Sequence, residues 1–97
     1  MKITSCLAII AFCAVVAPAA DWPNFRGPTH DGISKETGWT AEWPADGPKV
    51  LWKAKVGMGF SAIVVANGRA YTQGNTKDVD TIFCFDANNG TPVWKHS

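Results

Sequence analysis

A Trp-Lys dipeptide occurs twice in this chain, at Trp52 and again at Trp94. The two tryptophans lie 42 residues apart, and a short run of β-branched or aliphatic residues precedes each of them. A period of roughly 40–45 residues with four strands in each unit is typical of a β-propeller. If the spacing is a true repeat, the segment between the two tryptophans must supply the four strands.

The sequence from Val50 onward carries strand patterns and no helical periodicity. Asn67-Gly68 predicts a tight hairpin, because both central residues of a type I′ turn need a positive φ. Alternating and β-branched runs predict strands on either side of this turn and further along. The predicted strands are 49–56, 61–66, 69–73, 81–85 and 92–96, with a polar loop at 74–80 and a turn at 86–90. We therefore expect an all-β chain, with one extra outer strand at 49–56 and a first four-stranded blade at 60–97.

The first twenty residues are predicted to be a secretory signal peptide. Lys2 supplies the positive start, an apolar run covers residues 3–16, and Ala17-Pro18-Ala19 forms an A-x-A cleavage site. The apolar run is shorter than the ~20 residues that span a bilayer. We expect cleavage near Ala19-Ala20, an exported chain in the periplasm or outside the cell, and no membrane span afterwards.

Removal of the leader leaves a chain without net charge and with one thiol. Residues 20–97 contain eight basic and eight acidic side chains, so the sequence offers no basic stripe for nucleic acid. Cys84 is the one cysteine after residue 20, and an internal disulfide is therefore excluded in the processed chain.

Residues 21–48 are predicted to form an irregular arm. Four prolines and four glycines interrupt every regular element in this segment. Five large apolar side chains make it too hydrophobic for a disordered linker, and we expect them to be buried against a larger body. They are Trp22, Phe25, Ile33, Trp39 and Trp43.

The stretch CFDANNGTPVW, residues 84–94, has the features of a hairpin that ends in a docking side chain. Asp86 can accept hydrogen bonds from the N–H groups of the turn. Gly90 can adopt the positive φ that closes a short loop with a bulge. Trp94 can pack its large ring against a neighbouring sheet.

This stretch resembles the A-x-D-A-x-T-G-x-x-x-W tryptophan-docking motif of the PQQ-like (pyrroloquinoline-quinone-type) β-propeller repeats. Asp86, Ala87, Gly90 and Trp94 match the motif, whereas Cys84 replaces an alanine and Asn89 a threonine. The resemblance implies that the tryptophan docks between blades and that a small residue at position 84 leaves room for it.

The arm and the first tryptophan extend this resemblance. The opening DWPNFRGP is similar to the start of exported PQQ-like repeat proteins. Trp52 matches the motif less well, which suits an outer strand that completes the last blade of a ring. Since a propeller needs about four to eight blades, we expect the 97 residues to be the N-terminal piece of a longer protein.

No catalytic, cofactor-binding or metal-binding residue is predicted in this segment. Gly57-Met-Gly59 resembles part of a dinucleotide fingerprint, but a strand rather than a helix is expected after it. Asp78 and Asp80 lack the glycine and glutamate of a calcium loop, and His30 and His96 lack a zinc-type spacing.

The predicted function is that of a binding or scaffold module in the periplasm or cell envelope. Its expected partners are the remaining blades and envelope proteins. The alternative is the N-terminal part of a quinoprotein dehydrogenase that oxidises alcohols or sugars with PQQ and calcium. In that group, the resemblance implies an adjacent cysteine pair and carboxylates from several blades, and this sequence contains no such pair.

Overall fold

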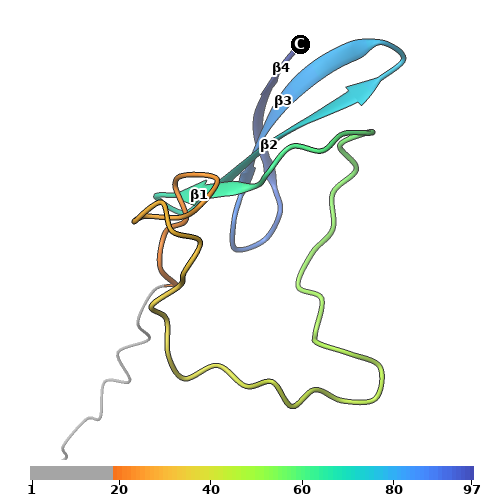
Figure 1. Ribbon diagram of the computed structural model, residues 1–97. Helices are drawn as coiled ribbons and strands as arrows, with labels where there is room; N and C mark the ends of the chain where they lie inside the picture. The colour runs from red at the N-terminus through yellow and green to blue at the C-terminus, as the bar shows by residue number, and fades with distance from the viewer. Residues whose placement is uncertain (1–18) are drawn as a thin grey trace, which may run out of the picture.

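The computed structural model describes residues 19–97, so the predicted signal peptide lies almost wholly outside the described residues. Four strands form one open antiparallel sheet in chain order, and the described part contains no helix. Figure 1 shows this meander, with the long irregular segment before β1 looping away from it. The strands are β1 (Val64–Ala66), β2 (Arg69–Thr76), β3 (Val79–Asp86) and β4 (Pro92–His96). The predicted all-β class and four-stranded meander are confirmed.

The hairpin between β1 and β2 has the predicted turn. Ala66 pairs with Arg69, so only Asn67 and Gly68 lie between the strands. Their φ angles are 51° and 74°, as a type I′ turn requires.

The predicted polar loop at 74–80 is wrong, because both strands continue through most of it. β2 and β3 meet at another two-residue turn, in which Lys77 and Asp78 have φ angles of 51° and 63°. Asn75 lies opposite Asp80, and its Nδ2 donates a hydrogen bond of 2.8 Å to Oδ1 of that aspartate. This polar pair continues the ladder into a segment whose composition predicts a loop.

The predicted strand at 49–56 is also absent from the structure. Residues 49–57 are not paired with any strand in the described part of the chain. The segment instead crosses β2 where Gly74 has no side chain, and a Cβ there would collide with the Val56 carbonyl group. Met58 then exchanges two backbone hydrogen bonds with Asn75, of 2.9 and 2.7 Å. A strand needs a neighbour for its N–H and C=O groups, and this segment has none beyond that bridge.

The sheet has two faces, and its buried centre is small. Register places Ala70, Phe83 and Phe85 on one face and Tyr71 and Cys84 on the other. Ala70, Cys84 and Phe85 are the buried hydrophobic residues of the described part. The rings of Phe83 and Phe85 stack with centroids 5.8 Å apart.

The arm touches the sheet at its beginning. Trp22 exchanges two backbone hydrogen bonds with Val65, of 2.8 and 2.9 Å, and so extends the sheet beyond β1. In this structure, the large apolar side chains of the arm are not all buried, since Phe25 is 78% exposed and Trp39 76% exposed. A single small sheet offers too little apolar surface to cover them.

Candidate functional site: a tryptophan seat on the last hairpin

The indole of Trp52 lies on the turn between β3 and β4, in what we call the tryptophan seat, formed by Phe85, Ala87 and Gly90. Its Nε1 donates a hydrogen bond of 2.9 Å to the carbonyl oxygen of Ala87, 35 residues further along the chain. Its ring packs at 45° to that of Phe85, with centroids 5.9 Å apart. The seat therefore satisfies the single polar group of the indole and covers part of its apolar surface, so that Trp52 is half-buried.

Gly90 provides the flat floor of the seat. A Cβ at this position would lie 2.6 Å from the Cδ2 and Cε3 atoms of Trp52, too close for any side chain. The φ angle of Gly90 is 73°, a conformation that also favours glycine. Two independent requirements, the backbone conformation and the approach of the indole, thus select glycine here.

Asp86 shapes the turn that carries the seat. Its Oδ1 accepts hydrogen bonds from the backbone N–H groups of Asn88, at 2.9 Å, and Asn89, at 3.3 Å. The N–H of Gly90 donates to the Asp86 carbonyl oxygen at 2.8 Å and closes the loop. The role predicted for Asp86 from its residue type is confirmed.

The seat is tied to the first hairpin of the sheet. The N–H of Ala87 donates a hydrogen bond of 2.9 Å to the carbonyl oxygen of Gly68. Both turns therefore lie at the same end of the sheet, and the Asn67-Gly68 turn helps to position the residue whose carbonyl group receives Trp52.

Trp94 lies on the opposite face of the sheet from the seat. A β-bulge puts Cys84 opposite Trp94 and Phe85 opposite Pro92, which leaves Val93 as the extra residue. The ring of Trp94 packs against Tyr71, with centroids 6.0 Å apart and a 52° angle between the rings. Trp94 remains 43% exposed.

Cys84 lies between these two rings and is completely buried. Its cross-strand neighbours in the register are Tyr71 on β2 and Trp94 on β4. A small side chain at this position lets the two rings meet above it, so the thiol acts as a small apolar group.

The structure brings together most of the motif residues that the sequence singled out. Ala87 and Gly90 form part of the seat, Asp86 shapes the turn that carries it, and the indole in the seat is that of Trp52. The sequence did not single out Phe85 and Tyr71, which pack against the two tryptophans. Strand alternation around Cys84 was the available signal for Phe85.

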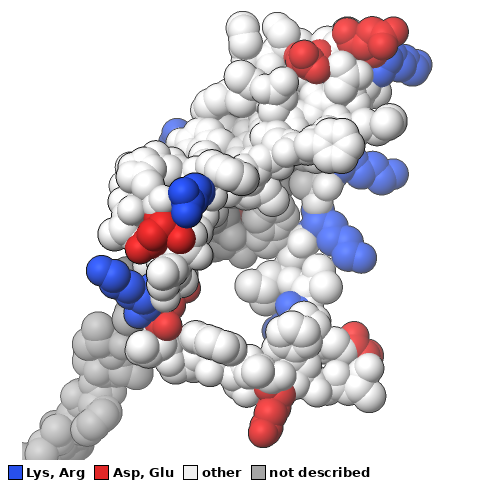
Figure 2. Space-filling view, in the orientation of Figure 1, with Lys and Arg blue, Asp and Glu red and all other residues white. Residues whose placement is uncertain are grey.

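A groove runs between the segment before β1 and the last two strands. Its floor contains Phe83 and Phe85, and Lys53, Lys55 and Lys95 are among its lining residues. Figure 2 shows basic and acidic side chains interspersed on the visible face, without an extended patch of one sign. Within residues 19–97, no three His, Cys, Asp or Glu side chains are grouped closely enough to hold a metal ion.

Comparison of the sequence with models of protein families found no match, and neither the curated proteins nor the solved structures searched contain one. In the described part of the chain, no helix is long and apolar enough to span a bilayer.

Proposed function

We propose that this chain is the first part of an exported PQQ-like β-propeller that acts as a binding or scaffold module in the periplasm or cell envelope. The observation that carries the proposal is the docking of Trp52 on the hairpin turn of the following sheet. The motif resemblance assigns the same kind of contact to the tryptophan of each repeat.

The two faces of the sheet support a stacked arrangement. One face receives the indole of Trp52 and the opposite face presents the indole of Trp94, one repeat of 42 residues later. A unit that accepts a tryptophan on one face and offers one on the other can be repeated side by side. Under this proposal, Trp94 enters a second seat, one period beyond Ala87 and Gly90.

The proposal also accounts for the segment at 49–56. Its tryptophan is seated, but its backbone has no neighbouring strand in the described residues. In a ring, this segment would become the outer strand of the last blade and pair with three strands supplied from the far end of the protein. Such closure removes the exposed edges of an open sheet.

The binding role is proposed because the groups gathered in the seat serve to hold the fold together. The seat uses an indole, a carbonyl group and a glycine to hold the segment before β1 against the sheet, so these groups have a structural use here. The partners we propose are the other blades and proteins of the envelope, which would bind the surface of the completed ring.

The first test is the coding sequence downstream of residue 97. We expect further repeats, each with an aspartate-alanine turn and a glycine at a spacing close to 42 residues. A natural stop codon directly after Ser97 would contradict the proposal. The number of blades then follows from a structure of the complete protein.

The second test separates a scaffold from an enzyme. The complete protein is titrated with PQQ and calcium while dye-linked oxidation of alcohols and sugars is followed. We expect no turnover above that of PQQ and calcium without the protein. Saturable cofactor binding with turnover would overturn the scaffold role and favour the quinoprotein dehydrogenase.

A further inference from the structure

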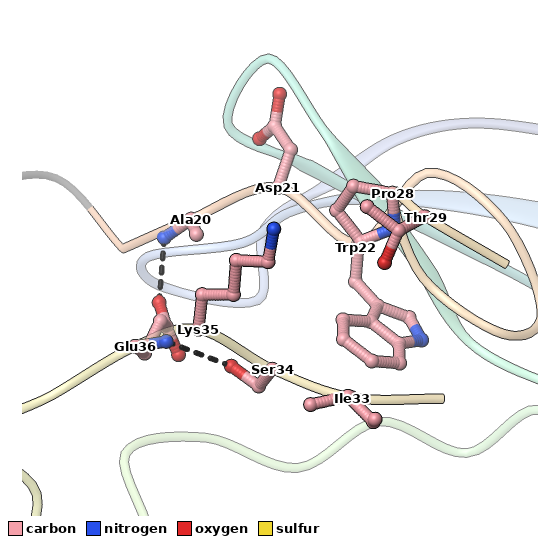
Figure 3. A pocket seen from close by; sticks show the side chains of 9 residues that line it. All are labelled: Ala20, Asp21, Trp22, Pro28, Thr29, Ile33, Ser34, Lys35 and Glu36. Carbon is pink, nitrogen blue, oxygen red and sulfur yellow. Dashed lines mark hydrogen bonds between the residues drawn. The ribbon is translucent and has the colours of Figure 1, made fainter. Parts of the chain in front are cut away.

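The backbone N–H of Ala20 points at a carboxylate of the arm. It donates a hydrogen bond of 2.6 Å to Oε1 of Glu36, sixteen residues further along the chain. Figure 3 shows this contact at the edge of a small cavity, whose lining also includes Trp22, Ser34 and Lys35.

The fold of the arm places Glu36 at this position. The chain reverses direction after Trp22 through a turn in which the N–H of Gly27 donates to the Asn24 carbonyl oxygen at 2.9 Å. The N–H of Gly32 then donates to the Arg26 carbonyl oxygen at 2.8 Å. The arm therefore passes its own beginning again at Glu36, whose N–H donates to the Ser34 hydroxyl oxygen at 3.2 Å.

The two residues after Ala20 are held by the sheet. Oδ2 of Asp21 accepts a hydrogen bond of 3.3 Å from the N–H of Asn67. Trp22 is paired with Val65 through two backbone hydrogen bonds. The nitrogen of residue 20 thus has a defined place beside the hairpin between β1 and β2.

We infer that the Glu36 carboxylate binds the α-amino group that forms when the leader is cleaved between Ala19 and Ala20. This inference rests on the proposed export of the chain. Cleavage adds water across the peptide bond, so that Ala19 leaves with a carboxylate and Ala20 retains an amine, which takes up a proton at neutral pH. The hydrolase is a signal peptidase.

Cleavage changes the chemistry of a contact that already has the right geometry. Before cleavage, residue 20 offers one neutral amide N–H to Glu36. After cleavage, the same nitrogen carries three hydrogens and a full positive charge, and the hydrogen bond becomes a charge-assisted ion pair. Cleavage one residue later would remove this nitrogen, so Glu36 recognises one particular new terminus.

Other charges near the new terminus are Asp21 and Lys35. The carboxylate of Asp21 is directed to the Asn67 N–H, and in Figure 3 the Lys35 side chain extends away from the Glu36 carboxylate. Glu36 is therefore the acidic group placed to pair with the ammonium, which fastens the start of the processed chain to the arm.

The test begins with export of the full chain from a bacterium and measurement of the intact mass of the processed protein. The α-amine is then labelled near neutral pH with 2-pyridinecarboxaldehyde, which reacts with unprotonated N-termini. We expect Glu36→Gln to speed labelling by about two- to fivefold, the range that an exposed ion pair supports. Glu42→Gln, which removes another exposed carboxylate of the arm, should leave the rate unchanged.

The outcomes separate the inference from the proposed export. The purified chain that still carries its leader is also cleaved with signal peptidase in detergent, which produces the amine without transport. If the chain is not exported but is cut in vitro before Ala20, and Glu36→Gln speeds labelling, binding of the amine by Glu36 is supported and only the proposed export is contradicted. A new terminus at another residue, or equal labelling rates for Glu36→Gln and the unaltered chain, would overturn the inference.

Discussion

Gly90 is the single residue on which the tryptophan seat depends most directly. It has a positive φ angle, and its missing Cβ leaves the space that the Trp52 ring fills. Gly68 offers a matched comparison, because its φ of 74° is almost the same and no atom lies within 4 Å of its virtual Cβ. Substitution at Gly68 therefore measures the cost of backbone strain alone, and substitution at Gly90 adds the loss of the docked indole.

We expect Gly68→Ala to lower the free energy of unfolding by about 1 kcal/mol through left-handed backbone strain alone. Gly90→Ala should cost about 1–3 kcal/mol more, because the added methyl group displaces the indole. Urea unfolding followed by circular dichroism measures both, and tryptophan fluorescence reports the release of Trp52. Equal losses for the two variants would show that the seat adds no stability.

Cys84 allows a second prediction at the residue scale, based on its position beneath Tyr71 and Trp94. Cys84→Ala should change the free energy of unfolding by less than about 1 kcal/mol, since both side chains are small and the thiol has no polar role. Cys84→Leu should cost about 1–3 kcal/mol by overpacking this closed position. Thermal or urea unfolding of both variants checks the difference, and a leucine that is tolerated as well as alanine would contradict it.

Among the elements, the crossing of residues 56–58 over β2 makes a prediction of its own. Gly74→Ala should destabilise the chain by about 1–3 kcal/mol, because the Val56 carbonyl group occupies the position of the new methyl group. Gly59→Ala is the control, since the nearest atom to its virtual Cβ is the Gln73 carbonyl oxygen at 3.4 Å. Urea unfolding should show a clearly smaller loss for this second variant.

The turn of the arm makes a prediction about pH. The Thr29 hydroxyl donates a hydrogen bond of 2.7 Å to Oδ1 of Asp31, and the Ile33 N–H donates one of 3.0 Å to the same atom. These two hydrogen bonds, that of Thr29 above all, lower the pKa of Asp31 below its ordinary value. The pKa is lower in the folded turn than in the unfolded chain. The turn is therefore favoured above the unfolded pKa, and this contribution is lost as the pH falls through the folded one.

A carboxyl-carbon NMR titration measures this effect. We expect Asp31 to titrate below an ordinary aspartate, and Thr29→Ala to move its pKa part of the way back because Ile33 still donates. A pKa that is unchanged by the substitution would show that the hydroxyl does not stabilise the carboxylate.

For the molecule as a whole, the structure predicts an uneven distribution of stability. β2 and β3 form the longest ladder, and the buried residues Ala70, Cys84 and Phe85 lie within it. β1 and β4 pair with this ladder on either side, whereas the described chain before β1 is attached mainly through bridges at Trp22 and Met58 and through the seat of Trp52. Local opening should therefore be frequent between these attachment points.

Hydrogen exchange measured by NMR tests this distribution. We expect the slowest amides in β2 and β3, intermediate protection for the amides of Trp22 and Met58, and fast exchange around Trp39 and Trp43, which lie on the exposed part of the arm. Slow exchange around Trp39 and Trp43 would mean that the arm is covered in solution and would contradict its exposure in the structure.

The sequence was enough to predict the strand order, the Asn67-Gly68 turn and the roles of Asp86 and Gly90. These features depend on local rules, such as alternation along a strand, positive φ and side-chain acceptors in a turn. Tertiary structure decided the fate of residues 49–56 and of the arm, because pairing and burial depend on which surfaces are present nearby. It also decided that Trp52 occupies the seat, since a sequence motif specifies the shape of a docking surface without specifying which side chain in space will reach it.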